Sequence, residues 1–441
     1  MKPRLILAFI PLLLALMLAC ITVQTVATQP PAAPSVAQQE PGNIPLLPTT
    51  ATPVALSTDN PQPTTTAIPI SQPQVTQKDG AALNVELLPV PIFKPVFPPN
   101  AIPSMAIDSS GSVHFFWHPY MSSSGAFIYY TDYAGGGKWT PIAKVAETLG
   151  TSQMRFPPLV GTDGHIHLLW FNSLSMGGPY RLMYASFDGQ AWSPEEEVYR
   201  SKANSGLSGR LFFDSQSTLH VLVTDSDMIA DHYFDLARVN GVWSSPVEVK
   251  PDLGRYANWH VLPDQAGVIH FYGQDALTDN KLLFATSANP QVVTNHAVIA
   301  AHDFQTVLDN TDTLYYSWTG QVPVPGGNVT GLHFQCLDSS LNLWLEIIPT
   351  GLSGLASNVL VAQDEALQTL YAWETADGQI HLMQPHGCAQ ADMWTMPLPA
   401  PGKNTRELAS LAVDASFKKA CLFILLHPGN AHELFCVDLN Q

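Results

Sequence analysis

Charged residues are scarce in this chain of 441 residues, and basic residues are the scarcest. Asp, Glu, Lys and Arg make up 12% of the sequence, which is about half the usual share. The 19 basic and 36 acidic residues give a formal net charge of −17. No run of Lys or Arg is present that would neutralise a phosphate backbone, so the composition argues against a nucleic-acid partner.

Several motifs that carry chemistry are also missing. The sequence has no Gly-x-Ser-x-Gly elbow, phosphate-binding loop, dinucleotide fingerprint or His-Glu-x-x-His motif. Cysteine occurs only five times, and no pair has the Cys-x-x-Cys spacing that favours structural zinc. We therefore expect no metal and no cofactor, and the catalytic residues, if there are any, are unknown at this stage.

The N-terminus combines a short basic region, an apolar stretch and a cysteine. Residues 1–4 carry two positive charges, and the apolar residues 5–18 are too short for an ordinary membrane span. The following run Met17-Leu18-Ala19-Cys20 resembles a bacterial lipoprotein lipobox, with Met17 where leucine is usual. The resemblance implies that residues 1–20 are a signal peptide and that Cys20 carries a lipid anchored in the cell membrane. An uncleaved anchor and an ordinary secretory signal are the alternatives, and in each case the protein is exported to the extracytoplasmic side.

Four further cysteines form an even set. In an oxidising compartment Cys336, Cys388, Cys421 and Cys436 can pair in three ways. Because Cys421 and Cys436 fall on consecutive expected strands of the last repeat, we favour a disulfide between these two.

Residues 21–80 are dominated by Pro, Thr, Ala, Gln and Ser. Such a segment lacks the aromatic residues and the amphipathic period needed to bury apolar surface, so we expect a disordered stalk that is partly polyproline. Its expected purpose is to hold the following domain away from the membrane.

Residues 81–441 contain a repeat with a period of about fifty residues. Residues 157–199 show it best, as four short apolar runs separated by Asp/Gly turns. The second run of each copy begins at Val113-His114, Ile166-His167, Leu219-His220, Ile269-His270, Leu314-Tyr315, Leu370-Tyr371 and Cys421-Leu422. Seven copies of four antiparallel strands predict an all-β, seven-bladed β-propeller, with six or eight blades as alternatives because the fifth and seventh copies are weak. The last copy lacks one strand, and we expect residues 83–92 to supply it and close the ring.

The turn before the fourth run carries a family resemblance. Ser186-Phe-Asp-Gly-Gln-Ala-Trp192 resembles the Asp-box (BNR repeat) of sialidase-type propellers, with one residue missing between Asp and Gly. In that family the box is a structural turn, in which Asp accepts hydrogen bonds from backbone amides and Trp packs into the blade. The resemblance covers roughly residues 100–441 and implies the propeller architecture more strongly than any activity.

The resemblance also implies where a sialidase-like site would lie. The family's first substrate-binding arginine belongs to an Arg-Ile-Pro motif, and here the matching stretch is Ala101-Ile102-Pro103. Three other arginines share one place in their repeats. Arg155, Arg255 and Arg406 stand 8, 9 and 8 residues before the aspartate that ends the expected first strand, namely Asp163, Asp264 and Asp414. We expect them, with Tyr256 and Trp259, to face one mouth of the channel as candidate ligand-binding residues; capping of loops and pairing with surface carboxylates are the alternatives.

Histidine recurs at one repeat position, in His114, His167, His220 and His270. Equivalent positions on different blades are too far apart to share a metal ion, so we expect core histidines that hydrogen-bond to a neighbouring strand.

Three functions fit these patterns. The missing Arg-Ile-Pro arginine favours a non-catalytic, cell-surface module that recognises a glycan or a protein. A divergent sialidase-like glycoside hydrolase with an arginine-lined carboxylate pocket is the first alternative, and an envelope scaffold lipoprotein is the second.

Overall fold

A computed structural model gives the fold of the chain, and all the residues that it describes lie in the unit 68–441. The described residues are 74–78, 83–90, 103–118, 126–134, 137–148, 156–161, 163–173, 179–201, 206–226, 231–249, 257–275, 281–289, 293–297, 305–324, 327–337, 344–347, 359–364, 366–388, 390–396, 398, 405–427 and 431–439.

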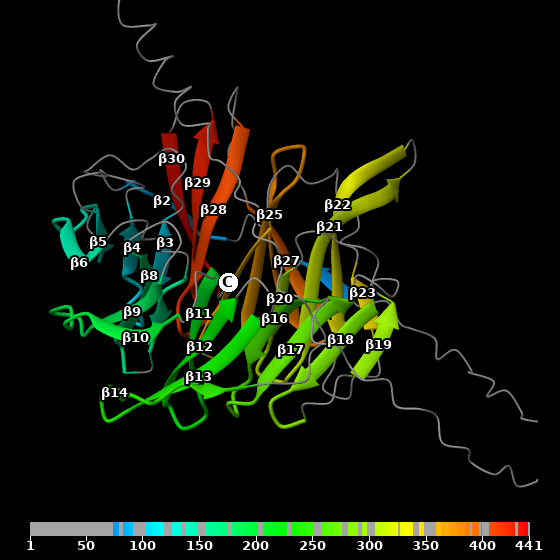
Figure 1. Ribbon diagram of the computed structural model, residues 1–441. Helices are drawn as coiled ribbons and strands as arrows, with labels where there is room; N and C mark the ends of the chain where they lie inside the picture. The colour runs from blue at the N-terminus through cyan, green and yellow to red at the C-terminus, as the bar shows by residue number, and fades with distance from the viewer. Residues whose placement is uncertain are drawn as a thin grey trace, which may run out of the picture. The chain divides into compact units, whose positions relative to one another are not determined.

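Over these residues the protein is all-β, without a helix, and its strands form seven sheets (Figure 1). We number the sheets 1 to 7 in chain order. The first three contain β3 (Ser104–Ile107), β4 (Val113–Trp117), β5 (Ala126–Tyr133) and β6 (Ala143–Thr148); β7 (Leu159–Val160), β8 (Ile166–Ser173), β9 (Tyr180–Phe187) and β10 (Glu196–Arg200); and β11 (Gly206–Phe213), β12 (Leu219–Ser226), β13 (Asp231–Val239), β14 (Val242–Trp243) and β15 (Val247–Glu248).

Sheets 4 to 7 repeat the same order of antiparallel neighbours. They contain β16 (Ala257–Pro263), β17 (Ile269–Asp275), β18 (Lys281–Thr286) and β19 (Val293–Ala297); β20 (Gln305–Leu308), β21 (Leu314–Val324), β22 (Gly327–Leu337) and β23 (Trp344–Ile347); β24 (Leu360–Gln363), β25 (Thr369–Glu374), β26 (Ile380–His386) and β27 (Gln390–Met396); and β28 (Thr405–Val413), β29 (Lys419–His427) and β30 (Ala431–Asp438). Each of the seven positions expected to open a second strand lies in the second strand of its sheet.

The core lies between successive sheets. Separate clusters of buried apolar side chains join sheet 1 to 2, 2 to 3, 3 to 4, 5 to 6 and 6 to 7. A further cluster joins sheet 7 back to sheet 1, with the rings of Phe115 and Phe423 only 5.2 Å apart. This cyclic packing is a propeller arrangement with at least six blades.

Two strands from the N-terminal side add to sheets built much later in the chain. β2 (Val85–Leu88) pairs antiparallel with β30, so that Val85 lies opposite Val437. β1 (Gln74–Gln77) pairs parallel with β27 and gives sheet 6 a fifth strand, a pairing that the sequence did not suggest. β1 lies within the residues for which a stalk is expected.

The structure contains two disulfides. Cys421 and Cys436 are directly opposite each other on β29 and β30, as the sequence favoured. Cys336 of sheet 5 bonds to Cys388 of sheet 6 and ties these two neighbours together covalently.

An aspartate follows the first strand in six of the seven sheets and holds the turn to the second strand. Oδ1 of each accepts a hydrogen bond from at least one backbone amide two to five residues later: Asp108, Asp214, Asp264, Asp309, Asp364 and Asp414. Sheet 2 has Gly161 at this place. The carboxylate of Asp163, two residues later in the chain, fills the space that a Cβ on residue 161 would need. The same turn is therefore made seven times.

The repeated histidines connect this turn to the neighbouring strand. In sheet 1 His114 Nε2 lies 3.0 Å from Asp108 Oδ2, and its Nδ1 lies 2.9 Å from the Tyr130 hydroxyl. His167 and His220 likewise contact the third strand of their sheets, through the Tyr184 hydroxyl and Asp235, whereas His270 contacts Asp264 and Tyr272 of its own strand. The prediction of histidines that hydrogen-bond to a neighbouring strand is confirmed for His114, His167 and His220, of which His114 and His167 are buried.

Burial of neutral histidines predicts a loss of stability in mild acid. Burial lowers the pKa of His118, His167 and His260 to about 4. The unfolded chain takes up these protons near pH 6.5 and the folded chain does not, so the free energy of unfolding falls between pH 6.5 and pH 4, by at most roughly 3 kcal/mol per histidine. Chemical denaturation across this range should show a shallower decline for His167→Asn than for the wild type, because the variant lacks one of these groups.

The matched control is His165→Asn, since the His165 side chain is 41% exposed. An identical pH dependence in the wild type and in His167→Asn would contradict the proposed cause. The raised pKa of Asp364, about 6 through burial, acts in the opposite direction over the same range and is common to all variants.

Candidate binding site

A cavity of about 390 Å³ lies where the first strands of the sheets meet. β3, β7, β11, β16, β20, β24 and β28 all contribute lining residues, so the cavity occupies the central channel of the propeller. It extends to the end of the channel formed by the aspartate turns, because Asp264, Asp364 and Leu367 are among its lining residues.

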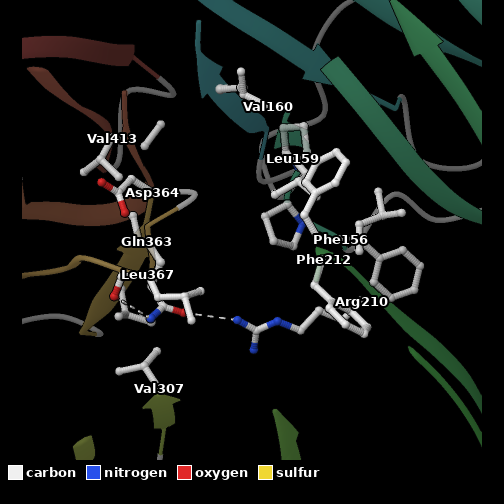
Figure 2. Close-up of a pocket in the computed structure, with 18 of the residues that line it drawn as sticks. Phe156, Leu159, Val160, Arg210, Phe212, Val307, Gln363, Asp364, Leu367 and Val413 are labelled. Atoms are coloured by element: carbon white, nitrogen blue, oxygen red, sulfur yellow. Dashed lines mark hydrogen bonds between the residues drawn. The ribbon is translucent and has the colours of Figure 1, made fainter. Parts of the chain in front are cut away.

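The walls of the cavity are largely apolar. Phe156, Leu159, Val160 and Phe212 form one wall, while Leu367 and Val413 lie opposite (Figure 2). A concave, mostly apolar site with a few polar groups is the usual form of a small-molecule site, and its volume is in the usual range of about 300–1,000 Å³.

Arg210 is the one basic residue among those that line the cavity. Its guanidinium extends across the channel from β11, and Nη2 donates a hydrogen bond to Oε1 of Gln363 on β24, at 3.1 Å (Figure 2). Gln363 is fixed in this orientation because its Nε2 donates to the carbonyl oxygen of Leu308 at 2.8 Å. The amide therefore presents an acceptor to Arg210.

The position of Arg210 is electrostatically unfavourable for a cation. The guanidinium lies deep in the protein, although part of its surface faces the cavity, and desolvation by burial lowers its pKa. Among the described side chains, no carboxylate lies within ion-pair distance of it. A buried cation without a counter-ion is costly, and an anionic ligand would remove that cost.

Two carboxylates in the same cavity differ in pKa. Burial raises the pKa of Asp364 to about 6, and nearby Asp414 acts in the same direction. Burial also acts to raise the pKa of Asp264, but hydrogen bonds from His270 and from the Val268 amide outweigh it, and the pKa is lowered. At neutral pH both groups accept hydrogen bonds, and in mild acid Asp364 gains a proton and becomes a donor.

The candidate residues named from the sequence have different outcomes. Arg155, Arg255 and Tyr256 lie outside the described residues; Trp259 lies in β16, but its side chain is not described. Arg406 is buried in β28, where Nε lies 3.8 Å from Oε2 of Glu433, and it is not among the residues that line the cavity. A ligand-binding role for these residues stays a prediction.

Arg210 and Gln363 were missed by the sequence reasoning. The predicted arginines lie eight or nine residues before an aspartate, whereas Arg210 precedes Asp214 by four and lies inside the strand. An arginine within an otherwise apolar inner strand, Gly209-Arg210-Leu211-Phe212-Phe213, was the available signal.

The turn from Ser186 to Trp192 is held by hydrogen bonds to its aspartate. Oδ1 of Asp188 accepts hydrogen bonds from the amides of Gln190 and Ala191, at 2.8 and 2.7 Å. Trp192 packs edge-on against Phe116 and Tyr130, which belong to the neighbouring sheet 1. The turn thus helps to join two sheets and lies away from the cavity lining.

Over the described part of the chain, no group of three or more His, Cys, Asp or Glu side chains is arranged to hold a metal ion. In the same part, no helix is long and apolar enough to cross a membrane.

No family model and no curated protein matches this sequence. Among solved structures, the β-propeller domain of the trilobed protease from Pyrococcus furiosus matches with a TM-score of 0.50 at 9% identity, over 78% of this chain and 95% of that chain. The lectin BP39L from Burkholderia pseudomallei matches with a TM-score of 0.46 at 10% identity, over 77% and 96%. A sialidase from Trypanosoma rangeli matches with a TM-score of 0.43 at 11% identity, over 77% of this chain and 54% of that chain. The first of these likenesses supports the β-propeller fold, and at such identities none of them establishes an activity.

The contrast between Arg210 and Arg406 predicts opposite effects on stability. Arg210→Met should leave the free energy of unfolding unchanged or raise it, because a desolvated charge is replaced by an apolar side chain among apolar walls. Arg406→Met should lower it by about 3–5 kcal/mol, because Glu433 and the buried Glu374 lose the arginine whose charge offsets theirs. Chemical denaturation at pH 7 measures both variants, and a large loss for Arg210→Met would show that Arg210 is a structural cross-link.

Proposed function

We propose that this protein is an exported, lipid-anchored, seven-bladed β-propeller that recognises an acidic glycan through the cavity around Arg210, without catalysing a reaction on it. The observation that carries the proposal is the partly desolvated guanidinium of Arg210 inside a cavity of about 390 Å³, where its hydrogen-bond partner among the described side chains is the neutral amide of Gln363. A carboxylate is the ligand group that matches a guanidinium in charge and in bidentate geometry.

The other cavity residues favour a sugar as the carrier of that carboxylate. The apolar walls to which Phe156 and Phe212 belong suit the apolar side of a sugar ring, and the carboxylates of Asp264 and Asp364 are acceptors for hydroxyl groups. A sialic acid or uronic acid combines a carboxylate, hydroxyls and an apolar face. The cavity has the size for one terminal sugar and excludes a folded protein partner.

The structural hydrogen bonds of the two carboxylates support a role without catalysis. Asp264 and Asp364 each hold the amide of a structural turn, and Asp264 is also bonded to His270. A general acid or nucleophile must be free to approach the glycosidic oxygen or the anomeric carbon.

One observation favours the alternative of a divergent exo-glycosidase. Asp364, with a pKa of about 6, and Asp264, with a lowered pKa, line the same cavity, and glycosidases use pairs of carboxylates whose protonation differs in this way. Turnover of fluorogenic sialosides or glucuronides that is lost in Asp364→Asn would establish this alternative.

Three features support seven blades, closure by β2 and membership of the sialidase/Asp-box superfamily. Seven sheets share one strand order, sheet 7 packs on sheet 1, and β2 supplies the fourth strand of sheet 7. The Asp188 turn has the hydrogen bonds of an Asp-box.

The binding proposal predicts a selective loss in Arg210→Ala. Isothermal titration of the full chain with N-acetylneuraminic acid, glucuronic acid and glucose should show binding of at least one acid and about tenfold or greater weakening in the variant, because a charge-assisted hydrogen bond is lost. The control Lys138→Ala changes an exposed lysine and should retain the affinity. An affinity for the acid that is unchanged in Arg210→Ala, or that falls equally in Lys138→Ala, would refute the proposal.

The proposed lipid anchor on Cys20 can be tested without knowing the ligand. Full-length protein expressed in a bacterial host should incorporate labelled palmitate and partition into detergent, and Cys20→Ser should abolish both. Labelling that persists in Cys20→Ser would place the lipid elsewhere and contradict the lipobox interpretation.

A further inference from the structure

A second cavity, of about 370 Å³, lies between the outer strands of sheets 2 and 3. β10 contributes Glu197, Val198, Tyr199 and Arg200, β13 contributes Phe234, and Pro246 lies between β14 and β15. We call these six residues the outer groove. It shares no residue with the cavity around Arg210.

The floor of the outer groove is aromatic and rigid. The rings of Tyr199 and Phe234 come from different sheets, with centroids 5.4 Å apart and planes inclined by 31°. The Tyr199 ring is buried, and its hydroxyl donates a hydrogen bond to Oδ2 of Asp225 at 2.8 Å, which holds the ring in place beneath Phe234. Pro246 is exposed beside this pair, so the groove offers an apolar surface to a ligand.

The rim of the outer groove carries a fixed ion pair. Arg200 donates from Nε and Nη2 to the two carboxylate oxygens of Glu197, each at 2.8 Å, and Arg181 Nε lies 3.6 Å from the same carboxylate. The Arg200 side chain remains 52% exposed, so its other N–H groups can donate outward. The pair thus presents donors and acceptors side by side beside an aromatic floor.

We propose that the outer groove binds a neutral sugar, with one face of a pyranose ring on Phe234 and Pro246, above the buried Tyr199, and its hydroxyls on Arg200 and Glu197. Hydroxyl groups both donate and accept, which matches the paired rim, whereas a simple anion would meet Glu197 and a simple cation would meet Arg200 and Arg181. The flat apolar face of a pyranose suits the aromatic floor. This site would allow one propeller to contact a glycan chain at two places.

Saturation-transfer NMR of the full chain with galactose, mannose, fucose and glucose tests this site. We expect at least one of these sugars to bind and its affinity to fall about tenfold in Phe234→Ala and in Arg200→Ala, because each variant removes one half of the contact. Arg200 is exposed, so its variant keeps the test valid if Phe234→Ala fails to fold.

Arg210→Ala separates this proposal from the acidic-glycan site. The variant should retain neutral-sugar binding, while Arg200→Ala should retain binding of the acidic sugar. No binding of any sugar in the panel, or binding that is unchanged in both outer-groove variants, would overturn the proposal. Neutral-sugar binding that is lost in Arg210→Ala would assign these sugars to the central cavity instead.

Discussion

The hydrogen bonds between a turn aspartate and the backbone amides that follow it organise this propeller. The same carboxylate–amide turn ends the first strand of six sheets, and Asp163 fills the same space in the seventh. Because the first strands line the channel, these turns also place the polar groups at its end, Asp264 and Asp364 among them. Histidines such as His114 and His220 contact both the turn aspartate and the third strand, so the turn is tied to the inner strands of its sheet.

This rigid frame allows the channel to hold a residue that does not favour folding. Arg210 has an amide partner and no ion-pair partner among the described side chains, whereas Arg238 and Arg406, also in the sheets, each pair with a glutamate. An apolar side chain at this position would fill the channel at a lower cost in folding free energy. The proposed amphipathic, hydroxylated and acidic ligand rests on this unfavourable placement and on the apolar walls around it.

The sequence predicted the repeated features well and the individual ones poorly. The period located the second strand of each sheet, and the spacing of His114, His167, His220 and His270 indicated inward-facing histidines. The last two cysteines suggested their own disulfide. Each of these patterns arises because a strand must pair with its neighbours in the sheet. β1 was missed because a four-residue edge pairing, Gln74–Gln77 with β27, leaves no apolar pattern. Arg210 and Gln363 were missed because their meeting depends on which inner strands face each other across the channel, and no local spacing contains that information.

The most direct test of the account is a crystal structure of the protein soaked with N-acetylneuraminic acid or glucuronic acid. The account predicts a sugar in the central cavity, with its carboxylate on the guanidinium of Arg210 in place of, or beside, the present bond to Gln363, and with a ring face toward Phe156 or Phe212. An empty cavity at saturating sugar, with the Arg210–Gln363 bond unchanged, would contradict it and would leave Arg210 as a cross-link of the channel.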